Sequence, residues 1–178
     1  MNSAFEEKIN SELRGFLLLQ HEIDAHFPQA LDIEDKWDSI AQSYMPDGIR
    51  EFRNYPAASL AWVMYIGMAV TQYWEEDWEV YGHLDDIYLY LRDKQGYDTM
   101  DEYIRRKVLH LKGTAFKTTE ALVQECAKRT YSALCREHIK AGTHEAFEAY
   151  TACLHQLYLM GMAVQLHRLG YHMQALGV

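Results

Sequence analysis

Every residue from position 60 to position 70 is apolar or glycine, and no polar face interrupts the run. A helix that is apolar on all sides must be covered on all sides, so it belongs in the middle of a helical bundle. The longest apolar tract, 57–70, has 14 residues including one serine, which is too short to span a bilayer comfortably. The run therefore predicts a central helix of a protein core and no membrane segment.

Apolar residues recur at steps of three or four along most of the chain, which is the spacing of amphipathic helices. The turn signal MPDG at 45–48 is expected to end the second helix, and Gly82 is expected to end the long one. The expected helices are 3–27, 32–44, 56–81, 83–94, 99–112, 114–140 and 143–167. We therefore predict an all-α fold, a single domain over 1–178, built as an antiparallel bundle of six to seven helices. The apolar helices at about 56–81 and 143–167 form its central pair.

The central run is echoed later in the chain, since 66-IGMAV-70 returns as 160-MGMAV-164. A four-residue identity is expected about 0.2 times by chance in a chain of this length, so the echo is weak evidence of a duplication. A glycine inside a helix costs about 1 kcal/mol relative to alanine. We therefore expect a packing reason for Gly67 and Gly161, namely that both lie at helix crossings in the core.

The charge balance excludes several kinds of partner. The chain is acidic, with 17 Lys and Arg against 26 Asp and Glu and a net charge of −9, so it repels phosphate backbones and anionic lipid. The densest basic cluster, 105–107, follows Asp101 and Glu102 and is interpreted as a solvated helix face. Neither nucleic acid nor a membrane is an expected partner.

The cysteines and the N-terminus indicate the compartment. Cys126, Cys135 and Cys153 are odd in number, lack CxxC spacing and fall in apolar periodic stretches, so we expect buried free thiols. The first residues are acidic where a signal peptide would be basic. Both observations predict a cytoplasmic protein.

One stretch has the composition of a metal site. Glu76, Glu79, His83 and Asp86 are spaced three, four and three residues apart, which would place them in one stripe of an unbroken helix. Gly82 argues that the helix breaks there, and both Glu-x-x-His and HExxH are absent from the chain. The alternative is a solvated acidic face, and the sequence predicts no cofactor.

A second stretch could line a ligand pocket. His155 and Gln156 come just before a wholly apolar segment, and a polar pair entering a core could form a pocket with Tyr65, Tyr73 or Tyr158. The alternative is a boundary histidine satisfied by one hydrogen bond. No nucleophile lies in a recognisable catalytic setting such as GxSxG, and glycine-rich phosphate loops are missing, so no catalytic residue can be named.

Aromatic residues suggest the leading function. Trp74, Trp78 and Tyr81 share a face of the long helix, and if exposed they would form an interface, whereas if buried they would only fill a core. We expect a non-catalytic module that binds a protein partner or its own copy. The alternative is a small-molecule or metal-binding helical domain, enzymes included, with its site near His155 or along the stripe from Glu76 to Asp86.

Overall fold

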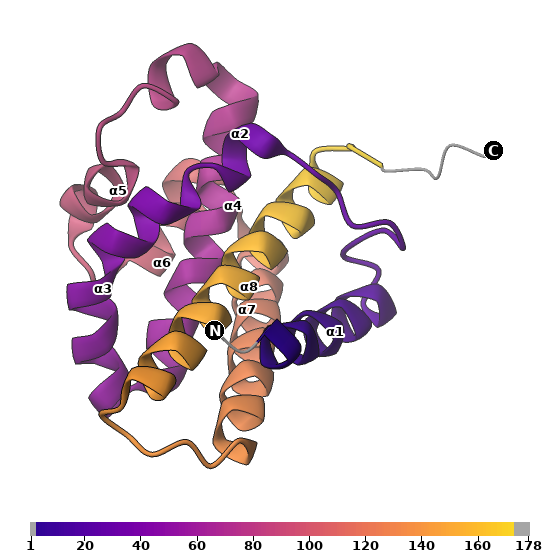
Figure 1. Ribbon diagram of the computed structural model, residues 1–178. Coiled ribbons are helices and arrows are strands. Elements are labelled where there is room, and N and C mark those ends of the chain that lie inside the picture. Colours follow the sequence, from indigo (N-terminus) through magenta and orange to yellow (C-terminus); the bar gives the residue numbers. More distant parts are fainter. Residues whose placement is uncertain (1–2, 173–178) are drawn as a thin grey trace.

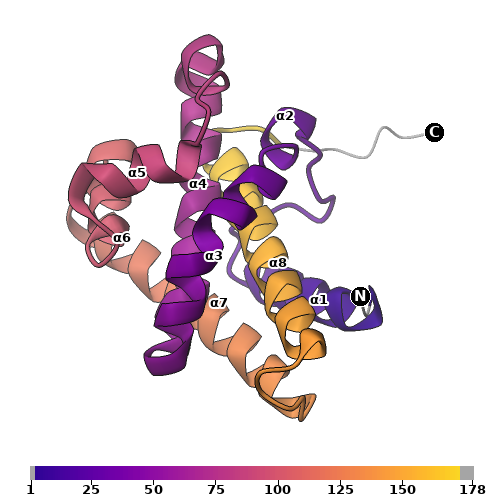
Figure 2. The ribbon, with the colours of Figure 1, turned by 60° about the vertical axis from the view of Figure 1, so that its left-hand side comes forward.

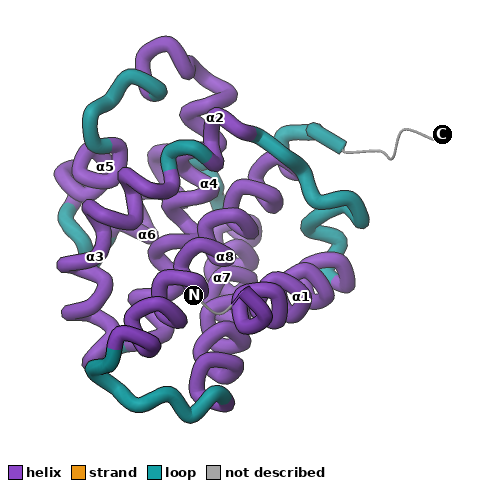
Figure 3. The backbone as a smooth tube through the Cα atoms, viewed as in Figure 1, coloured by secondary structure: helices purple, strands orange, loops and turns teal. Residues whose placement is uncertain are grey.

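A computed structural model describes residues 3–172 of the chain, and within that range every regular element is a helix (Figure 3). The elements are α1 (Ser3–Leu19), α2 (Leu31–Glu34), α3 (Trp37–Asn54), α4 (Pro56–Tyr81), α5 (Ile87–Gln95), α6 (Met100–Tyr103), a π-helical segment η1 (Ile104–Val108), α7 (Gly113–Arg136) and α8 (His144–Arg168). Six of the helices have nine or more residues, while α2 and α6 have four each. The predicted all-helical bundle is confirmed.

Helices α4 and α8 form the centre of the bundle, and the other helices pack around them (Figures 1 and 2). Side chains pair along the two helices in the same order: Ser59 with Tyr150 near their starts, and Gln72 with Gln165 near their ends. The two helices therefore run in the same direction, unlike the antiparallel arrangement expected of the bundle. A parallel pair is possible here because α5, α6 and α7 carry the chain back between them.

The central crossing depends on the two echoed glycines. A Cβ on Gly67 would overlap the Tyr158 carbonyl oxygen, and a Cβ on Gly161 would overlap the Met64 carbonyl oxygen. Only glycine allows the two main chains to approach this closely, which explains why both helices tolerate a residue of low helix propensity. The expectation that both glycines lie at a helix crossing in the core is confirmed.

The first helix ends eight residues earlier than the expected boundary of 27. His21 adopts a left-handed conformation, with φ +56°, and the Glu22 amide donates to the Leu17 carbonyl, which closes the helix end. The chain then continues through an irregular connection to α2, with Ile23 buried in the core. The apolar periodicity up to residue 27 therefore reflects packing of this connection as well as of the helix.

The expected turn at MPDG is wrong, because α3 continues through it to Asn54. Asp47 is buried and is held by Tyr88, whose hydroxyl donates to it at 2.7 Å, and by Arg92 at 2.8 Å. A Cβ on Gly48 would overlap the Tyr44 ring, so this glycine serves close packing. Tertiary contacts thus fix a helix where local sequence favours a turn.

Helix α4 ends at Tyr81 as expected, but it is interrupted before that point. Asp77 has extended backbone angles, φ −164° and ψ 81°, and the next regular helix begins only at Ile87. Asp86 caps that helix, since its carboxylate accepts from the Leu89 amide at 2.9 Å. The last turns of α4 and the connection that follows them project from the rest of the bundle (Figure 2).

The basic cluster at 105–107 does not form a wholly solvated face. The Arg105 side chain is 1% exposed, stacks on the Phe116 ring, and pairs with Asp101 at 2.9 Å and Glu120 at 2.6 Å. The interpretation as a solvated face is therefore wrong for Arg105. A long guanidinium can enter the core when carboxylates and a ring compensate for its lost hydration.

Within residues 3–172, none of the helices combines the length and the apolar character that crossing a membrane requires.

Candidate functional site

His155 and Gln156 lie in a packed polar network. His155 Nδ1 is 2.8 Å from Glu6 Oε1, and its ring stacks on Trp37 at a centroid distance of 5.3 Å. Gln156 donates to the same Glu6 oxygen at 3.0 Å and accepts from Asn10 at 2.8 Å. These contacts join α1 to α8 and occupy His155 Nδ1 and both polar atoms of the Gln156 amide. The arrangement matches the alternative of a hydrogen-bonded boundary histidine.

The three tyrosines proposed for that pocket are all buried in the core. The Tyr158 hydroxyl donates to the Ile33 carbonyl at 2.6 Å. Tyr65 packs beneath the Arg105 guanidinium, and Tyr73 stacks on Tyr81 at a centroid distance of 4.1 Å. Burial raises the pKa of each of these tyrosines well above its usual value of 10. Tyr65 and Tyr73 therefore do not lie with His155, whereas the Tyr158 ring packs on Trp37, on which His155 also stacks.

The acidic stripe is divided by the interruption at Asp77 and by the end of α4. Glu76 accepts from Gln72 within its own helix, and Glu79 and His83 are exposed. The Asp86 carboxylate is occupied by the Ser43 hydroxyl at 2.7 Å and by its role as a helix cap. Among the described residues, these four side chains do not form a group with ligand atoms close enough to share an ion.

The aromatic residues proposed as an interface are half-buried and face different neighbours. Trp74 packs edge-on against Tyr171, at a centroid distance of 5.5 Å, and Trp78 lies beneath the Lys36 ammonium. Tyr81 packs onto Tyr73. Most of their apolar surface is thus used within the chain.

A groove that the sequence did not indicate lies at the other end of the bundle. It has a volume of about 670 Å³ and is formed by the end of α3, the end of α7, the connection from α7 to α8 and the start of α8. Its main apolar side chains are Ile49, Phe52, Leu134, Ile139, Phe147 and Tyr150. Phe147 is 44% exposed, so a large part of its ring is available for contact at this surface.

The electrostatics of this apolar groove differ from those of the whole chain. Arg53 and His138 line it, and no carboxylate is found among the described residues that form its walls. The net charge of the chain is nevertheless −9. The groove therefore presents an apolar surface with one cationic side chain, Arg53, on an otherwise acidic protein, which suits an apolar group flanked by negative charge.

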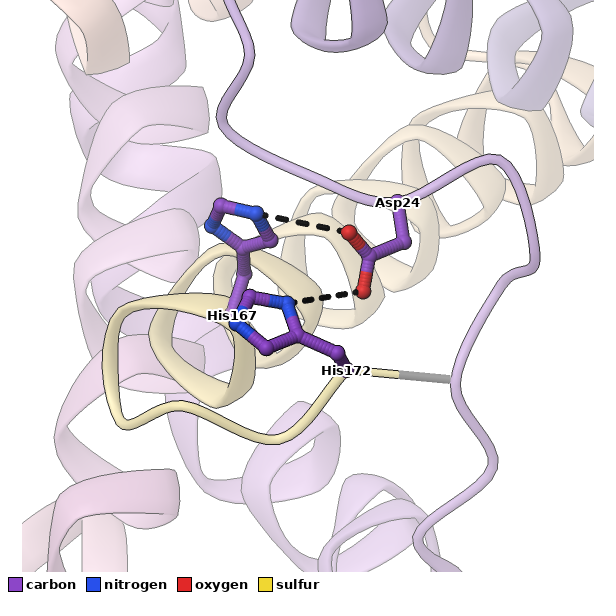
Figure 4. A group of neighbouring side chains, drawn as sticks. All are labelled: Asp24, His167 and His172. Carbon is purple, nitrogen blue, oxygen red and sulfur yellow. Dashed lines mark hydrogen bonds and ion pairs between the residues drawn. The ribbon is translucent and has the colours of Figure 1, made fainter. Parts of the chain in front are cut away.

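A second new feature lies at the far end of α8, where Asp24, His167 and His172 converge (Figure 4). His167 Nε2 is 3.4 Å from Asp24 Oδ1, and His172 Nδ1 is 3.3 Å from Asp24 Oδ2. The ligand atoms of the three side chains all lie within 4.8 Å of one another. This is the one such group of three among the described residues.

Comparisons of the chain with protein families, curated proteins and solved structures found no match.

Neither feature has a local signal in the sequence. The groove is built from segments up to about a hundred positions apart, and Asp24 is more than 140 positions from both histidines. A search for helical spacing, such as the one that selected Glu76 and His83, finds only groups on one helix. The one local hint for the histidine pair is the segment LHRLGYH at 166–172. A glycine that follows a helix often reverses the chain, and Gly170 lies between the two histidines.

Proposed function

We propose that this protein is a non-catalytic module that associates with copies of itself, the projecting end of α4 in one copy entering the apolar groove of the next. The observation that carries the proposal is the complementary chemistry of the two ends of the molecule. The proposal retains the predicted function, a non-catalytic module that binds its own copy. It places the contact on surfaces that are exposed in the single chain.

The projecting end of α4 is apolar and acidic. Val80 is 58% exposed, and Glu75, Glu76, Asp77 and Glu79 beside it are exposed as well. In the groove, Phe147 offers an apolar contact for Val80, and Arg53 offers a cation for the carboxylates. Contact of the apolar side chains supplies most of the free energy, since exposed ion pairs contribute only about 0–1 kcal/mol each.

The two surfaces lie at opposite ends of the bundle (Figure 1). A contact between different surfaces of identical chains is head-to-tail, and it forms a ring or an open chain instead of a closed two-fold dimer. A groove-to-groove dimer is disfavoured because it would place the Arg53 guanidinium groups of both copies close together. Self-association is therefore expected to continue beyond two copies.

The test uses two variants that each block one surface. Val80→Glu blocks the projecting end, and Phe147→Glu blocks the groove; both sites are exposed, so the fold is expected to persist. In sedimentation experiments the wild type should increase in mass with concentration in the micromolar range, whereas each variant alone should stay monomeric. A mixture of the two variants should form a one-to-one heterodimer, because each retains the surface that the other lacks.

The matched control is Leu89→Glu, an exposed apolar position on α5 with 42% exposure, which should associate like the wild type. A wild-type protein that stays monomeric at submillimolar concentration would overturn the proposal. Association that survives Val80→Glu but not Phe147→Glu would instead indicate a groove-to-groove dimer.

The groove also supports a second candidate, binding of a small apolar anion. Its volume of about 670 Å³ lies within the range of small-molecule sites, roughly 300–1,000 Å³, and Arg53 could pair with an anionic group. An anilinonaphthalene sulfonate should then fluoresce with the wild type and much less with Phe147→Glu or Arg53→Glu. Equal fluorescence of the three proteins would exclude this candidate.

A further inference from the structure

We propose that Asp24, His167 and His172 bind a divalent transition-metal ion of the zinc class. Two imidazole nitrogens and one carboxylate oxygen are a donor set that suits zinc and its neighbours, and hard ions such as magnesium prefer oxygen donors alone. The three side chains come from the α1–α2 connection, the last turn of α8 and the residues after it. Their convergence is thus made by the tertiary fold.

The spacing of the donors fits an ion between them. His167 Nε2 lies 3.4 Å from Asp24 Oδ1 and His172 Nδ1 lies 3.3 Å from Asp24 Oδ2, both longer than the roughly 2.7–2.9 Å of a charge-assisted hydrogen bond. With one ligand atom taken from each residue, the three atoms lie within 4.8 Å of one another. Zinc bonds of about 2.0–2.1 Å in a tetrahedral site separate neighbouring donor atoms by about 3.3 Å. Figure 4 shows both rings directed at the carboxylate of Asp24. Small side-chain rotations would complete the geometry.

The end of α8 brings the two histidines together. Gly170 has a φ of +92°, and the Tyr171 amide donates to the Leu166 carbonyl at 3.0 Å, which reverses the chain after the last turn. His172 thereby returns to His167, with ring centroids 5.0 Å apart. A side chain at Gly170 would strain this turn, so the glycine contributes to the site without touching it.

Contacts on both sides hold the three segments in place. The Tyr171 hydroxyl donates to Glu75 at 2.7 Å, which fixes the chain next to His172 against α4. Arg168 donates to both carboxylate oxygens of Glu22 at 3.1 Å, and Ile23 is buried, so the connection that carries Asp24 is anchored as well. Donors held in this way lose little conformational freedom when an ion binds.

A bound ion would cross-link the α1–α2 connection to the end of α8. Three protein donors leave a fourth position of a tetrahedral ion for water or an added ligand. The site is separate from the apolar groove, because Phe147 and His167 lie 20 residues apart on α8, about 30 Å at 1.5 Å per residue. It borders the projecting end of α4, since the hydroxyl of Tyr171, next to His172, donates to Glu75. Phe147→Glu should therefore abolish self-association and leave Zn²⁺ binding intact, which separates failure of one proposal from failure of the other.

The experiment is calorimetric titration of the metal-stripped full-length protein with Zn²⁺. We expect one ion per chain, no binding of Mg²⁺, and visible absorption bands when Co²⁺ is added in its place. His167→Gln, His172→Gln and Asp24→Ala should each weaken Zn²⁺ binding by on the order of 100-fold. His144→Gln is the matched control, since this exposed histidine at the start of the same helix pairs only locally with Glu148 among the described contacts.

Two results would overturn the proposal. The first is a wild type that binds no stoichiometric Zn²⁺; the second is Zn²⁺ affinity that is unchanged in His172→Gln and His167→Gln. His172 is exposed at the end of the described chain, so its variant should fold normally, which circular dichroism of the metal-free protein checks. A loss seen equally in His144→Gln would indicate adventitious binding to surface histidines.

Discussion

Gly67 of α4 and Gly161 of α8 face each other's main chains in a reciprocal contact. A Cβ on Gly67 would lie 3.2 Å from the Met162 amide nitrogen, and a Cβ on Gly161 would lie 3.1 Å from the Met68 amide nitrogen. The two contacts are related by the same offset of 94 residues that separates the echoed sequences. The echo therefore corresponds to one helix crossing made symmetrically by both helices.

Gly67→Ala should destabilise the protein despite the higher helix propensity of alanine. The new methyl group would overlap the Tyr158 carbonyl oxygen, a main-chain atom that cannot move independently, and we expect a loss of about 3 kcal/mol in the free energy of unfolding. Urea denaturation of the variant and the wild type measures this difference in the free energy of unfolding. The matched control is Gly15→Ala on α1, where nothing lies within 4 Å of the added Cβ, and it should stabilise by about 0.5–1 kcal/mol. Similar effects at both positions would contradict the account of the crossing.

Gln156→Leu should destabilise the junction of α1 and α8. The change removes a buried amide that donates to Glu6 and accepts from Asn10, so Asn10 would lose its acceptor and Glu6 would keep only its contact with His155. The expected loss is about 1–3 kcal/mol, measured by thermal or urea denaturation. Gln124→Leu, on an exposed position of α7, should change stability by less than about 0.5 kcal/mol. A neutral Gln156→Leu variant would show that the network contributes nothing to stability.

The cysteines should differ sharply in reactivity. Burial raises the pKa of Cys126 and of Cys153 to about 12, and both are fully buried, whereas Cys135 is exposed. The expectation of three buried thiols is thus wrong for Cys135. Ellman's reagent should modify one thiol in the native protein and three after unfolding, because the thiolate is the reacting species. A Cys135→Ser variant should show no rapid reaction; rapid modification of a second thiol would contradict the packing of α7 and α8.

Alkaline unfolding should begin near pH 10. Burial raises the pKa of Tyr44, Tyr65, Tyr73, Tyr88 and Tyr158 above the usual value of 10. The folded state therefore holds these protons more tightly than the unfolded chain. Their contribution to stability is complete below pH 10 and is lost as the pH rises toward the folded-state values. Tyrosinate absorbance from these residues and loss of helical circular dichroism should appear in one transition. Their ionisation in a chain that stays helical would show that these tyrosines are accessible.

The spacing of apolar residues predicted where helices occur more accurately than it predicted where they end. Thr143 begins α8 as a capping residue, accepting from the Ala146 amide at 3.1 Å, and the pattern of THEAFE was sufficient to predict it. The ends of α1 and α3 were missed for a different reason. At His21 a non-glycine residue adopts a left-handed conformation, and at Pro46 a helix continues because the buried Asp47 is held by other helices.

The sequence by itself determined an all-helical core with two apolar helices, because the period of apolar residues and the placement of glycines depend on the chain's local geometry. It could not predict which exposed side chains share a surface. Asp24 reaches His167 and His172 only because Gly170 reverses the chain and Arg168 holds the preceding connection against α8. The groove beside Phe147 likewise exists only where the ends of three helices meet. Such sites depend on packing between distant segments, and tertiary structure alone decides them.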